Sequence, residues 1–334
     1  MSMQAWIIEK AADGKSSMVL RTVEPPPLGP GDIRVKTEAV GVNRADLLQV
    51  RGLYPAPPGV DPRIPGLEYA GTVIEVGSRV QQFKVGDRVM GLVPGGSYAE
   101  QIVTSEREAV PVPDGMDMVT AASLPEIFMT AYRALFIEGG LQPGQWALIR
   151  PATSGVGLAA VQLVRALGAR SLGTSRSEER LQEAVRLGLD VPLLDSDAID
   201  LPQRVREATA GQGANVILDM LGGAAFAANI ASLALEGCMV MIGRMTGGNG
   251  ELDPGLMLMR RLRLRGMTMR AQPLEERIRI AQAFRERLLP LFERDRLQPL
   301  QLLVHAFNDA PQAYADMLAN KHLGKIVLRL SQAQ

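Results

Sequence analysis

The turn Pro151 to Gly157 combines small side chains with a spacing that could hold a diphosphate. It follows an apolar run, Trp146 to Ile149, and it opens a one-faced helical pattern. Ala152, Ser154 and Gly157 occupy the three positions of the dinucleotide fingerprint, where the turn, the pyrophosphate and the helix–strand contact leave little room for side chains. The turn therefore predicts a nucleotide site.

The start of the helical pattern would supply the other half of this site. Gly155 and Val156 fall in its first turn, where free N–H groups and a partial positive charge favour an anion. Because two fingerprint positions hold alanine and serine, a closely packed turn without any ligand is an equally good interpretation of this stretch alone. The residues that follow the turn favour the interpretation as a nucleotide site. Candidate strands at 169–174 and 214–219 flank a helix at 178–187, which is typical of a doubly wound parallel sheet.

Ser175, at the end of the second candidate strand, bears on the choice of nucleotide. An NAD-binding unit places an acidic residue about 20 residues beyond the glycines to bind the ribose hydroxyl. This chain has Ser175 there, followed by Arg176 and Arg180. Guanidinium groups match a phosphate in charge and donor geometry, so the pattern favours NADPH over NADH. The alternative is that Ser175 and Glu178 form a capping box and that Arg176 is merely solvated.

The chain has few residues that could bind zinc. It contains a single cysteine, Cys238, and two histidines, His305 and His322, both near the C-terminus. A structural zinc site needs four ligands and a catalytic one about three from the protein. The sequence therefore predicts chemistry without a metal and no internal disulfide, and it predicts a core strand around Cys238.

Length and charge bound the class of protein. A chain of 334 residues is too long for one ordinary core, so we expect two domains. The 36 basic and 36 acidic residues cancel, which leaves no long-range attraction for nucleic acid or an anionic membrane. No signal-peptide pattern or membrane-length apolar run is present. We therefore expect a soluble, cytoplasmic protein.

The remaining patterns outline the two domains, with a junction expected near Ser123. Short apolar strands cut by turns are typical of an all-β region. The expected elements are that β region at 25–112, a helical stretch at 121–138, strands at 237–243 and 262–268, a long amphipathic helix at 273–297 and a last strand at 325–330 that could return to the first domain.

Five motifs occur together over most of the chain. They are NRADLLQ at 43–49, RGLY at 51–54, PGLEYAG at 65–71, the ATSGVG turn at 152–157 and GKIVL at 324–328. In order and spacing they resemble the zinc-independent quinone oxidoreductases of the medium-chain dehydrogenase/reductase superfamily, near zeta-crystallin and its tumour-suppressor-induced quinone reductase branch. The resemblance implies an α/β protein with a GroES-like β-barrel catalytic domain at 1–122 and 272–334, a Rossmann domain at 123–271, and a homodimer paired through the Arg260–Gly266 edge.

The resemblance also implies the site residues. Those expected around the nicotinamide are Asn43, Asp46, Tyr54, Glu68, Glu126 and Thr130, and Gly243 and Lys325 are expected to join the cofactor contacts of the turn. Structural alternatives stay open for four of them. Asn43 could satisfy its own backbone in a turn, and Asp46 could only cap a helix. Tyr54 could pack against neighbouring prolines, and Glu68 could form an ion pair with Arg133 or Arg270.

The absence of metal ligands suggests which substrates are suitable. Hydride transfer without a Lewis acid suits an acceptor that is already electron-poor, with the cofactor supplying the chemistry and the protein the positioning. The sequence therefore predicts an NADPH-dependent reductase of quinones or related conjugated carbonyls. An enoyl-thioester reductase is the alternative enzyme, and a non-catalytic NADPH-binding protein is the alternative of another class.

Overall fold

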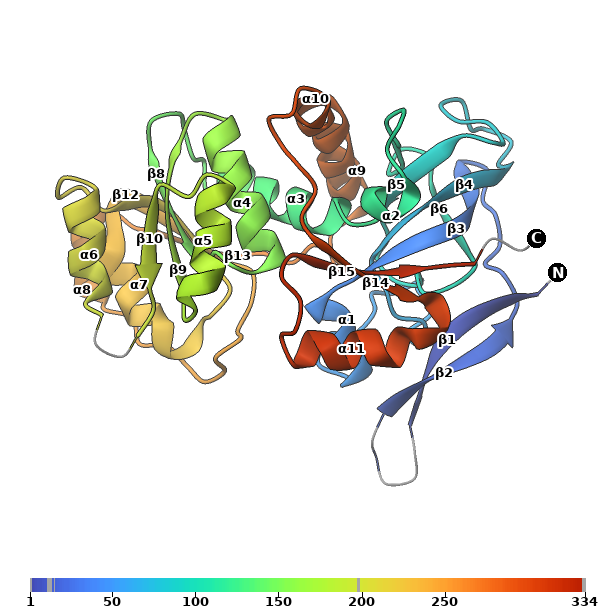
Figure 1. Ribbon diagram of the computed structural model, residues 1–334, viewed down its shortest axis with the longest axis horizontal. Coiled ribbons are helices and arrows are strands. Elements are labelled where there is room, and N and C mark those ends of the chain that lie inside the picture. The colour runs from blue at the N-terminus through green and yellow to red at the C-terminus, as the bar shows by residue number, and fades with distance from the viewer. Residues whose placement is uncertain (1, 11–13, 15, 197–198, 332–334) are drawn as a thin grey trace. The chain divides into compact units, whose positions relative to one another are not determined.

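The structure is a computed structural model that describes residues 2–10, 14, 16–196 and 199–331 (Figure 1). The chain forms two compact units, Met1–Met129 with Met269–Gln334, and Thr130–Thr268. The first division falls later than the junction expected near Ser123, within the helix Pro125–Tyr132 (α3). The second falls slightly before the expected one at 271/272.

The second unit contains a parallel sheet of six strands. Their spatial order is β10 (Val191–Leu194), β9 (Arg170–Ser175), β8 (Trp146–Arg150), β11 (Ala214–Asp219), β12 (Leu233–Met241) and β13 (Arg263–Gly266). The first strand in sequence lies in the middle and the order reverses beside it, which is the doubly wound arrangement that binds dinucleotides at the strand ends. The predicted parallel sheet is confirmed.

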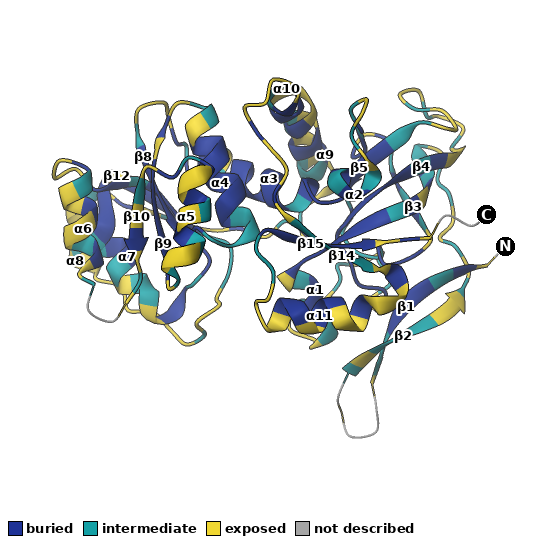
Figure 2. Cartoon of the chain, in the orientation of Figure 1, coloured by how far each residue is buried: buried dark blue, intermediate teal, exposed yellow. Residues whose placement is uncertain are grey.

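Helices connect these strands. They are α4 (Gly155–Ala166), α5 (Glu178–Arg186), α6 (Leu201–Ala208), a 3-10 turn Gly223–Ala225, α7 (Phe226–Ser232) and α8 (Pro254–Arg260). Figure 2 shows buried strands behind helices whose outer faces are exposed. Leu148, Leu172, Ile217 and Met239 are fully buried at the centre, because a parallel sheet covered on both faces needs apolar residues on both sides. Cys238 is buried in β12, as predicted.

The first unit is built on a sheet of seven strands. The order is β14 (Leu302–Ala306), β15 (Lys325–Arg329), β3 (Asp32–Val42), β4 (Glu68–Val76), β5 (Arg88–Leu92) and β7 (Val110–Pro111), with β6 (Gln101–Ser105) paired to β3. A separate hairpin joins β1 (Met3–Lys10) to β2 (Ser16–Val23). β15 runs antiparallel to β3, with Ile326 opposite Val42, so the C-terminal strand does return to the first unit.

The helices that lie wholly or partly in the first unit are short, and the two long helical patterns of the sequence are each divided. They are α1 (Arg44–Val50), α2 (Met118–Ala121), α3, α9 (Leu274–Ala283), α10 (Leu289–Glu293), a 3-10 turn Phe307–Asp309 and α11 (Ala310–Leu318). The helix expected at 273–297 is interrupted by a π-helical segment, Phe284–Leu288. Pro290 has no N–H for the bond to residue 286, which accounts for the altered pairing one turn earlier.

The helical stretch expected at 121–138 is also divided. α2 ends at Ala121, α3 begins at Pro125, and a π-helical segment, Arg133–Glu138, follows α3 in the second unit. A residue that precedes proline is disfavoured in helical conformation, and Leu124, which precedes Pro125, lies outside both helices.

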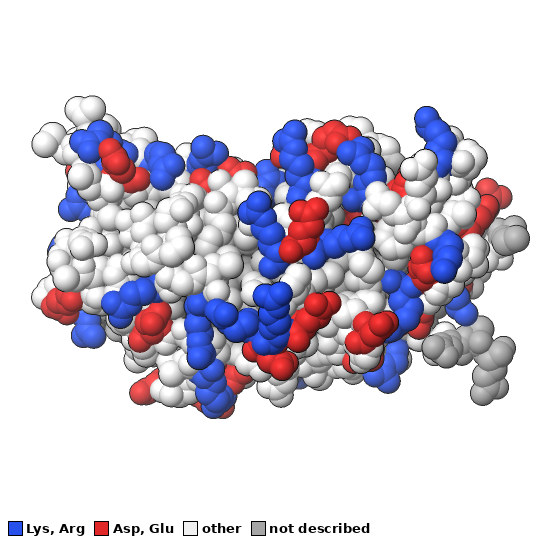
Figure 3. Space-filling model, turned by 90° about the horizontal axis from the view of Figure 1, so that it is seen from above, with Lys and Arg blue, Asp and Glu red and all other residues white. Residues whose placement is uncertain are grey.

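The formal net charge of zero reflects equal numbers of basic and acidic residues. On the face seen in Figure 3, basic and acidic side chains are intermixed over the surface. Among the described residues, no helix has both the length and the apolar character needed to cross a bilayer.

Candidate active site

Asn43 lies at the junction of β3 and α1, where the strand turns into the helix. Its backbone is extended, with φ −129° and ψ 152°, and its N–H donates to the Asp46 carboxylate over 2.8 Å. Asp46 is the third residue of α1, so it satisfies the amide at the start of the helix as in a capping box. Asp46 therefore does cap the start of α1, and its catalytic role stays a prediction.

The Asn43 side chain belongs to a buried polar cluster with Glu68 and Lys325. Its amide nitrogen donates to Glu68 Oε1 over 2.9 Å, and its amide oxygen accepts from the Lys325 ammonium. Lys325 also forms an ion pair with Glu68, and the two side chains are 4% and 0% exposed. Asn43 therefore does more than satisfy its own backbone.

The prediction that Arg133 or Arg270 pairs with Glu68 was wrong. Arg133 pairs with Glu138 over 3.1 Å, and Arg270 donates to backbone carbonyls. β15 pairs with the end of β3 and thereby brings Lys325 beside Asn43. The cation that neutralises Glu68 thus comes from the far end of the chain.

The second oxygen of Glu68 and the glycine beneath it complete this cluster. Glu68 Oε2 accepts from the Glu126 N–H, at the start of α3, over 2.9 Å. A Cβ at Gly41 would lie 2.0 Å from Glu68 Oε1 and 2.7 Å from the carbonyl oxygen of Ala122. Only glycine leaves space for the carboxylate there, so β3 is shaped around Glu68.

Asp46 is a buried carboxyl group with an unusual proton affinity. Its Oδ2 also accepts from the Tyr98 hydroxyl over 3.1 Å. Burial raises the pKa of Asp46 to about 7, against the opposing effects of the Asn43 N–H and the Lys325 charge. Asp46 can therefore take up or release a proton near neutral pH.

Tyr54 lies in the loop after α1, half-buried, beneath the guanidinium of Arg270. Arg270 donates to the Tyr54 carbonyl oxygen over 2.9 Å, and its guanidinium carbon lies 5.4 Å from the centre of the Tyr54 ring. Burial, followed by the negative charge of Glu126, raises the pKa of Tyr54 to about 12. The phenol stays protonated at neutral pH and can donate a hydrogen bond or a proton.

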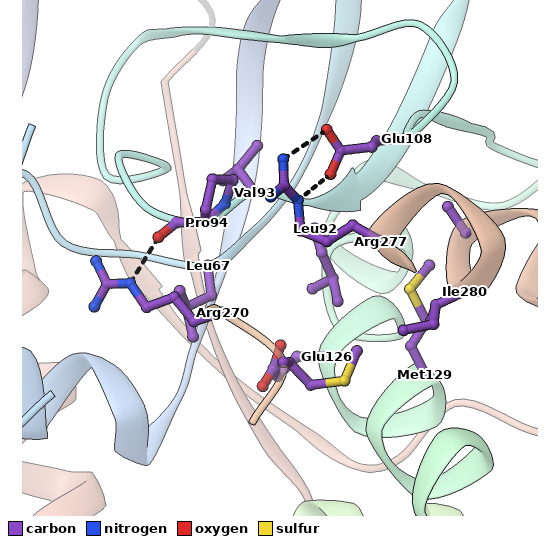
Figure 4. A pocket seen from close by; sticks show the side chains of 12 residues that line it. Leu67, Leu92, Val93, Pro94, Glu108, Glu126, Met129, Arg270, Arg277 and Ile280 are labelled. Carbon is purple, nitrogen blue, oxygen red and sulfur yellow. Dashed lines mark hydrogen bonds and ion pairs between the residues drawn. The ribbon is translucent and has the colours of Figure 1, made fainter. Parts of the chain in front are cut away.

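A narrow pocket lies beside these groups in the first unit (Figure 4). Apolar side chains, among them Leu67 and Ile280, line it together with Glu126, Arg270 and Arg277. Its space of about 20 Å³ is enough for one water molecule. This pocket alone is too small for a quinone.

In the second unit, the turn after β8 fits a diphosphate. Ser154 caps α4 and accepts from the Gly157 N–H over 2.9 Å. A Cβ at Gly157 would lie 2.3 Å from the Pro151 carbonyl oxygen, so only glycine permits this close approach. The N–H groups of Gly155 and Val156 belong to the first turn of α4, where no acceptor lies within the helix.

The residues after β9 show how the helix α5 is capped. α5 is capped by Ser177, which accepts from the Arg180 N–H over 3.3 Å, so the capping box of Ser175 with Glu178 is wrong. Ser175 is buried, and its oxygen accepts from the Ser177 N–H over 3.2 Å. Arg176 is exposed. The last residue of β9 therefore carries a hydroxyl rather than a carboxylate, and Arg176 and Arg180 follow it.

The structure places the other expected residues as follows. Ala152 is fully buried and donates to the Thr174 carbonyl oxygen over 2.9 Å, linking the turn to β9. A Cβ at Gly243 would come 3.0 Å from the Met220 carbonyl oxygen. Thr130 is buried, and among the described residues its hydroxyl has no hydrogen-bond partner. Lys325 lies in the first unit with Glu68.

Sequence reasoning missed a second buried cation, Arg150, at the end of β8. It is 5% exposed and donates to Asn229 over 2.6 Å and to Asp195 over 2.8 Å. These bonds tie β8 to the segments after β10 and β11, next to the turn. The sequence could have revealed this buried cation, because an arginine that directly follows the buried apolar run Trp146 to Ile149 has little access to solvent and needs partners.

Among the described residues, no three His, Cys, Asp or Glu side chains gather into a group that could hold a metal ion.

Comparisons with known proteins agree with this architecture. The family model described as "Alcohol dehydrogenase GroES-like domain" matches residues 29–114, and that described as "Zinc-binding dehydrogenase" matches residues 155–287. Quinone oxidoreductase-like protein 2 of Mus musculus is 32% identical over 254 residues, which cover 76% of this chain and 72% of that protein.

Two solved structures have the same fold over nearly the full length. The quinone oxidoreductase of Pseudomonas syringae pv. Tomato DC3000 is 28% identical with a TM-score of 0.84, covering 98% of this chain and 100% of the other. CurK enoyl reductase is 26% identical with a TM-score of 0.83, covering 99% of both chains.

Proposed function

Because this chain belongs to the quinone oxidoreductase family of the medium-chain dehydrogenase/reductase superfamily, we propose that it reduces quinones or related conjugated carbonyls with NADPH and without zinc. The oxidoreductase superfamily and its nicotinamide cofactor follow from that membership. The choice of NADPH, the acceptor and the independence of zinc are the proposal.

The observation that carries the proposal is the Asn43–Glu68–Lys325 cluster. The ammonium of Lys325 already neutralises Glu68 and binds the Asn43 oxygen, so a second cation beside it would be repelled. The amide of Asn43 is also a poor zinc ligand beside cysteine and histidine. Among the described residues, this cluster is therefore unsuited to hold a Lewis acid that would activate an ordinary carbonyl, which favours an acceptor that is electron-poor by itself.

The residues of the second unit provide for the cofactor, which supplies a hydride when bound. The first turn of α4 would hold the diphosphate through the Gly155 and Val156 N–H groups. Arg176 and Arg180 would hold the 2′-phosphate of NADPH, since guanidinium matches phosphate in charge and donor geometry. Ser175, in place of an acidic residue, removes the repulsion that a carboxylate would exert on that phosphate.

The first unit provides for the acceptor. Reduction places negative charge on the acceptor oxygen, which takes its proton from Tyr54 or from water. Tyr54 can donate a hydrogen bond to that oxygen because its phenol, with a pKa raised to about 12, stays protonated at neutral pH. Hydrogen bonds with Lys325 and Glu68 fix the orientation of the Asn43 side chain. Its amide can therefore pack against the acceptor in a constant position.

An enoyl-thioester reductase is the second candidate, favoured by the structural likeness to CurK enoyl reductase. Its product is an enolate that must be protonated on carbon, which a positioned acid accelerates by about a hundredfold or more. A non-catalytic NADPH-binding protein is the candidate from another class.

The test is NADPH oxidation with a panel of acceptors, measured with and without a metal chelator. We expect turnover of 1,4-naphthoquinone that survives chelation and exceeds turnover of crotonyl-CoA. Preference for crotonyl-CoA would establish the second candidate. Tight NADPH binding without turnover of any acceptor would establish the binding protein, and loss of activity with the chelator would refute the independence of zinc.

We also propose a homodimer formed through β13. This strand lies at the edge of its sheet and can add a strand from a second copy. Nearby on α8, Leu258 and Met259 are 77% and 76% exposed, which a partner surface would cover. The chain has a mass of 36.0 kDa, and light scattering should give twice that value for the parent. The double variant Leu258→Asp, Met259→Asp should give the mass of one chain.

A further inference from the structure

Arg270 is a buried cation held by the backbone of two loops. It follows β13 in the chain and is 3% exposed. Its Nε donates to the Pro94 carbonyl oxygen over 2.6 Å, and its Nη1 donates to the Tyr54 carbonyl oxygen over 2.9 Å. Two fixed carbonyls and the Tyr54 ring therefore set the plane of the guanidinium.

The third nitrogen of this guanidinium is unused. Arg270 Nη2 is buried, and among the described residues it has no hydrogen-bond partner. The carbonyls that hold the other two nitrogens carry no net charge, so no carboxylate bonded to Arg270 neutralises it within the described chain. Leaving a buried charged donor unsatisfied is unfavourable, and such a group at a candidate active site points to an oxygen ligand.

The neighbouring arginine shows how a structural cation is satisfied in the same pocket. Arg277 binds both oxygens of Glu108 over 2.6 and 3.3 Å and also donates to the Gln272 carbonyl oxygen. Figure 4 shows the Arg277–Glu108 pair on one side of the pocket and the Arg270 guanidinium on the other. The two arginines differ in that Arg277 has a carboxylate partner and Arg270 has only carbonyls.

Gly95 lies against the unused side of Arg270 and places no side chain there. A Cβ at Gly95 would lie 2.9 Å from Arg270 Nη2 and 2.7 Å from a methyl group of Val60. The backbone there has φ +157°, a conformation that favours glycine. Any side chain at this position would press against Nη2 and Val60.

We propose that Arg270 Nη2 binds the carbonyl oxygen of the acceptor and stabilises the negative charge that this oxygen gains on reduction. The hydride brings two electrons to the conjugated system, a carbonyl π pair moves onto the oxygen held by Nη2, and that oxygen then takes a proton from Tyr54 or water. This inference rests on the proposed reductase activity and defines its substrate as a compound whose reduction generates an oxyanion.

The test is the dependence of kcat/KM on the acceptor in Arg270→Lys, with Arg277→Lys as the matched control. The acceptors are 1,4-benzoquinones carrying zero to four methyl groups, because each methyl makes the product oxyanion more basic and more dependent on a donor. Removing one oxyanion donor costs about a hundredfold or more in turnover. We expect the loss in Arg270→Lys to grow from roughly tenfold for benzoquinone to roughly a hundredfold for the tetramethyl compound.

In Arg277→Lys, the loss of kcat/KM relative to the parent should be the same for every quinone. Both variants should keep the NADPH dissociation constant of the parent. A loss in Arg270→Lys that is the same for every quinone would overturn the inference, while the parent activity would still support the proposed function. If the parent turns over no quinone, the proposed function itself fails.

Gly95→Ala provides a second variant in case Arg270→Lys does not fold. It retains the arginine but places a methyl group against Nη2. We expect the same increase of the loss with quinone methylation, and an equal loss for all quinones in this variant would again overturn the inference.

Discussion

The two units achieve tight positioning by different physical means. In the first unit, buried charged and amide side chains hold one another, as Lys325 does with Glu68 and Asn43. In the second unit, the turn after β8 relies on backbone N–H groups and on the lack of a side chain at Gly157. The site in the first unit is held by charged and polar side chains, and the site in the second unit is formed by the backbone.

This difference has consequences for stability and for binding. A buried ion pair compensates a large desolvation cost, so removing one partner is strongly destabilising. A backbone site has no such charge to leave unpaired, and a change in it should impair ligand binding more than folding. Four predictions test this contrast, in order of decreasing expected effect, and a fifth tests the reductase assignment.

The largest effect is expected for Lys325→Met. The variant leaves the Glu68 carboxylate buried without its cation, so the free energy of unfolding should fall by about 3–5 kcal/mol, measured by urea denaturation. Glu68→Gln combined with Lys325→Met should recover part of this loss. The exposed pair of Arg21 and Glu9 gives the control, because Arg21→Met should cost less than about 1 kcal/mol. Equal effects of the two single variants would contradict the assignment of Lys325 to this cluster.

The second effect concerns the pH dependence of stability through Asp46. Its folded pKa of about 7 lies above the ordinary value of 3.8. The folded state therefore holds a proton that the unfolded state has lost, and stability should fall as pH rises from about 4 to about 7, by on the order of a few kcal/mol. Above pH 7 the decrease should end.

Asp46→Asn should abolish this decrease in denaturation curves recorded between pH 4 and 8. Asp61 offers a control of opposite sign, since the hydrogen bond from Arg63 lowers the pKa of Asp61. Its contribution is present above the ordinary pKa and is lost as pH falls through the folded value. A parent protein whose stability rises from pH 5 to pH 7 while Asp46→Asn behaves identically would refute the raised pKa.

A third prediction concerns Gly157→Ala in the backbone site. The added Cβ meets the carbonyl oxygen of Pro151 at 2.3 Å, and relieving such an overlap costs about 1–3 kcal/mol. If that displacement falls on the first turn of α4, NADPH affinity should drop by up to about a hundredfold, measured by calorimetry. Gly266→Ala is the matched control, because a Cβ at Gly266 meets nothing within 4 Å. Unchanged NADPH affinity in Gly157→Ala would show that the diphosphate lies elsewhere.

A smaller effect is expected at the end of β9. Arg176→Ala together with Arg180→Ala should weaken NADPH binding by about tenfold, while NADH binding should change little because NADH lacks the 2′-phosphate. Calorimetry with both nucleotides measures the ratio. A parent protein that prefers NADH, or a variant that loses affinity for both nucleotides equally, would make the choice of NADPH wrong.

The same contrast explains which features the sequence revealed. The parallel sheet and its turn could be predicted because their signals are local: a strand, a small-residue turn and a helix occupy adjacent residues. The cap of α1 by Asp46 was likewise within reach, since Asn43 and Asp46 are three residues apart.

The buried cluster could not be assembled from local signals. Lys325 lies 282 residues from Asn43, and only the pairing of β15 with β3 brings them together. Arg133 and Arg270 were reasonable partners for Glu68 by charge, but both have other bonds. The breaks in the two long helical patterns were missed although Pro125 and Pro290 signalled them, because the hydrophobic period continues across each break.

The most direct test of the reductase assignment is the effect of Tyr54→Phe on two activities, quinone reduction and enoyl-thioester reduction, both followed by NADPH oxidation at saturating NADPH. The hydroquinone oxygens can take their proton from water, so loss of the phenol should remove one hydrogen bond worth roughly 1 kcal/mol. We predict that quinone turnover stays within about tenfold of the parent and remains the faster of the two activities. A collapse of quinone turnover with unchanged NADPH affinity, or a parent that reduces the thioester faster, would contradict the assignment.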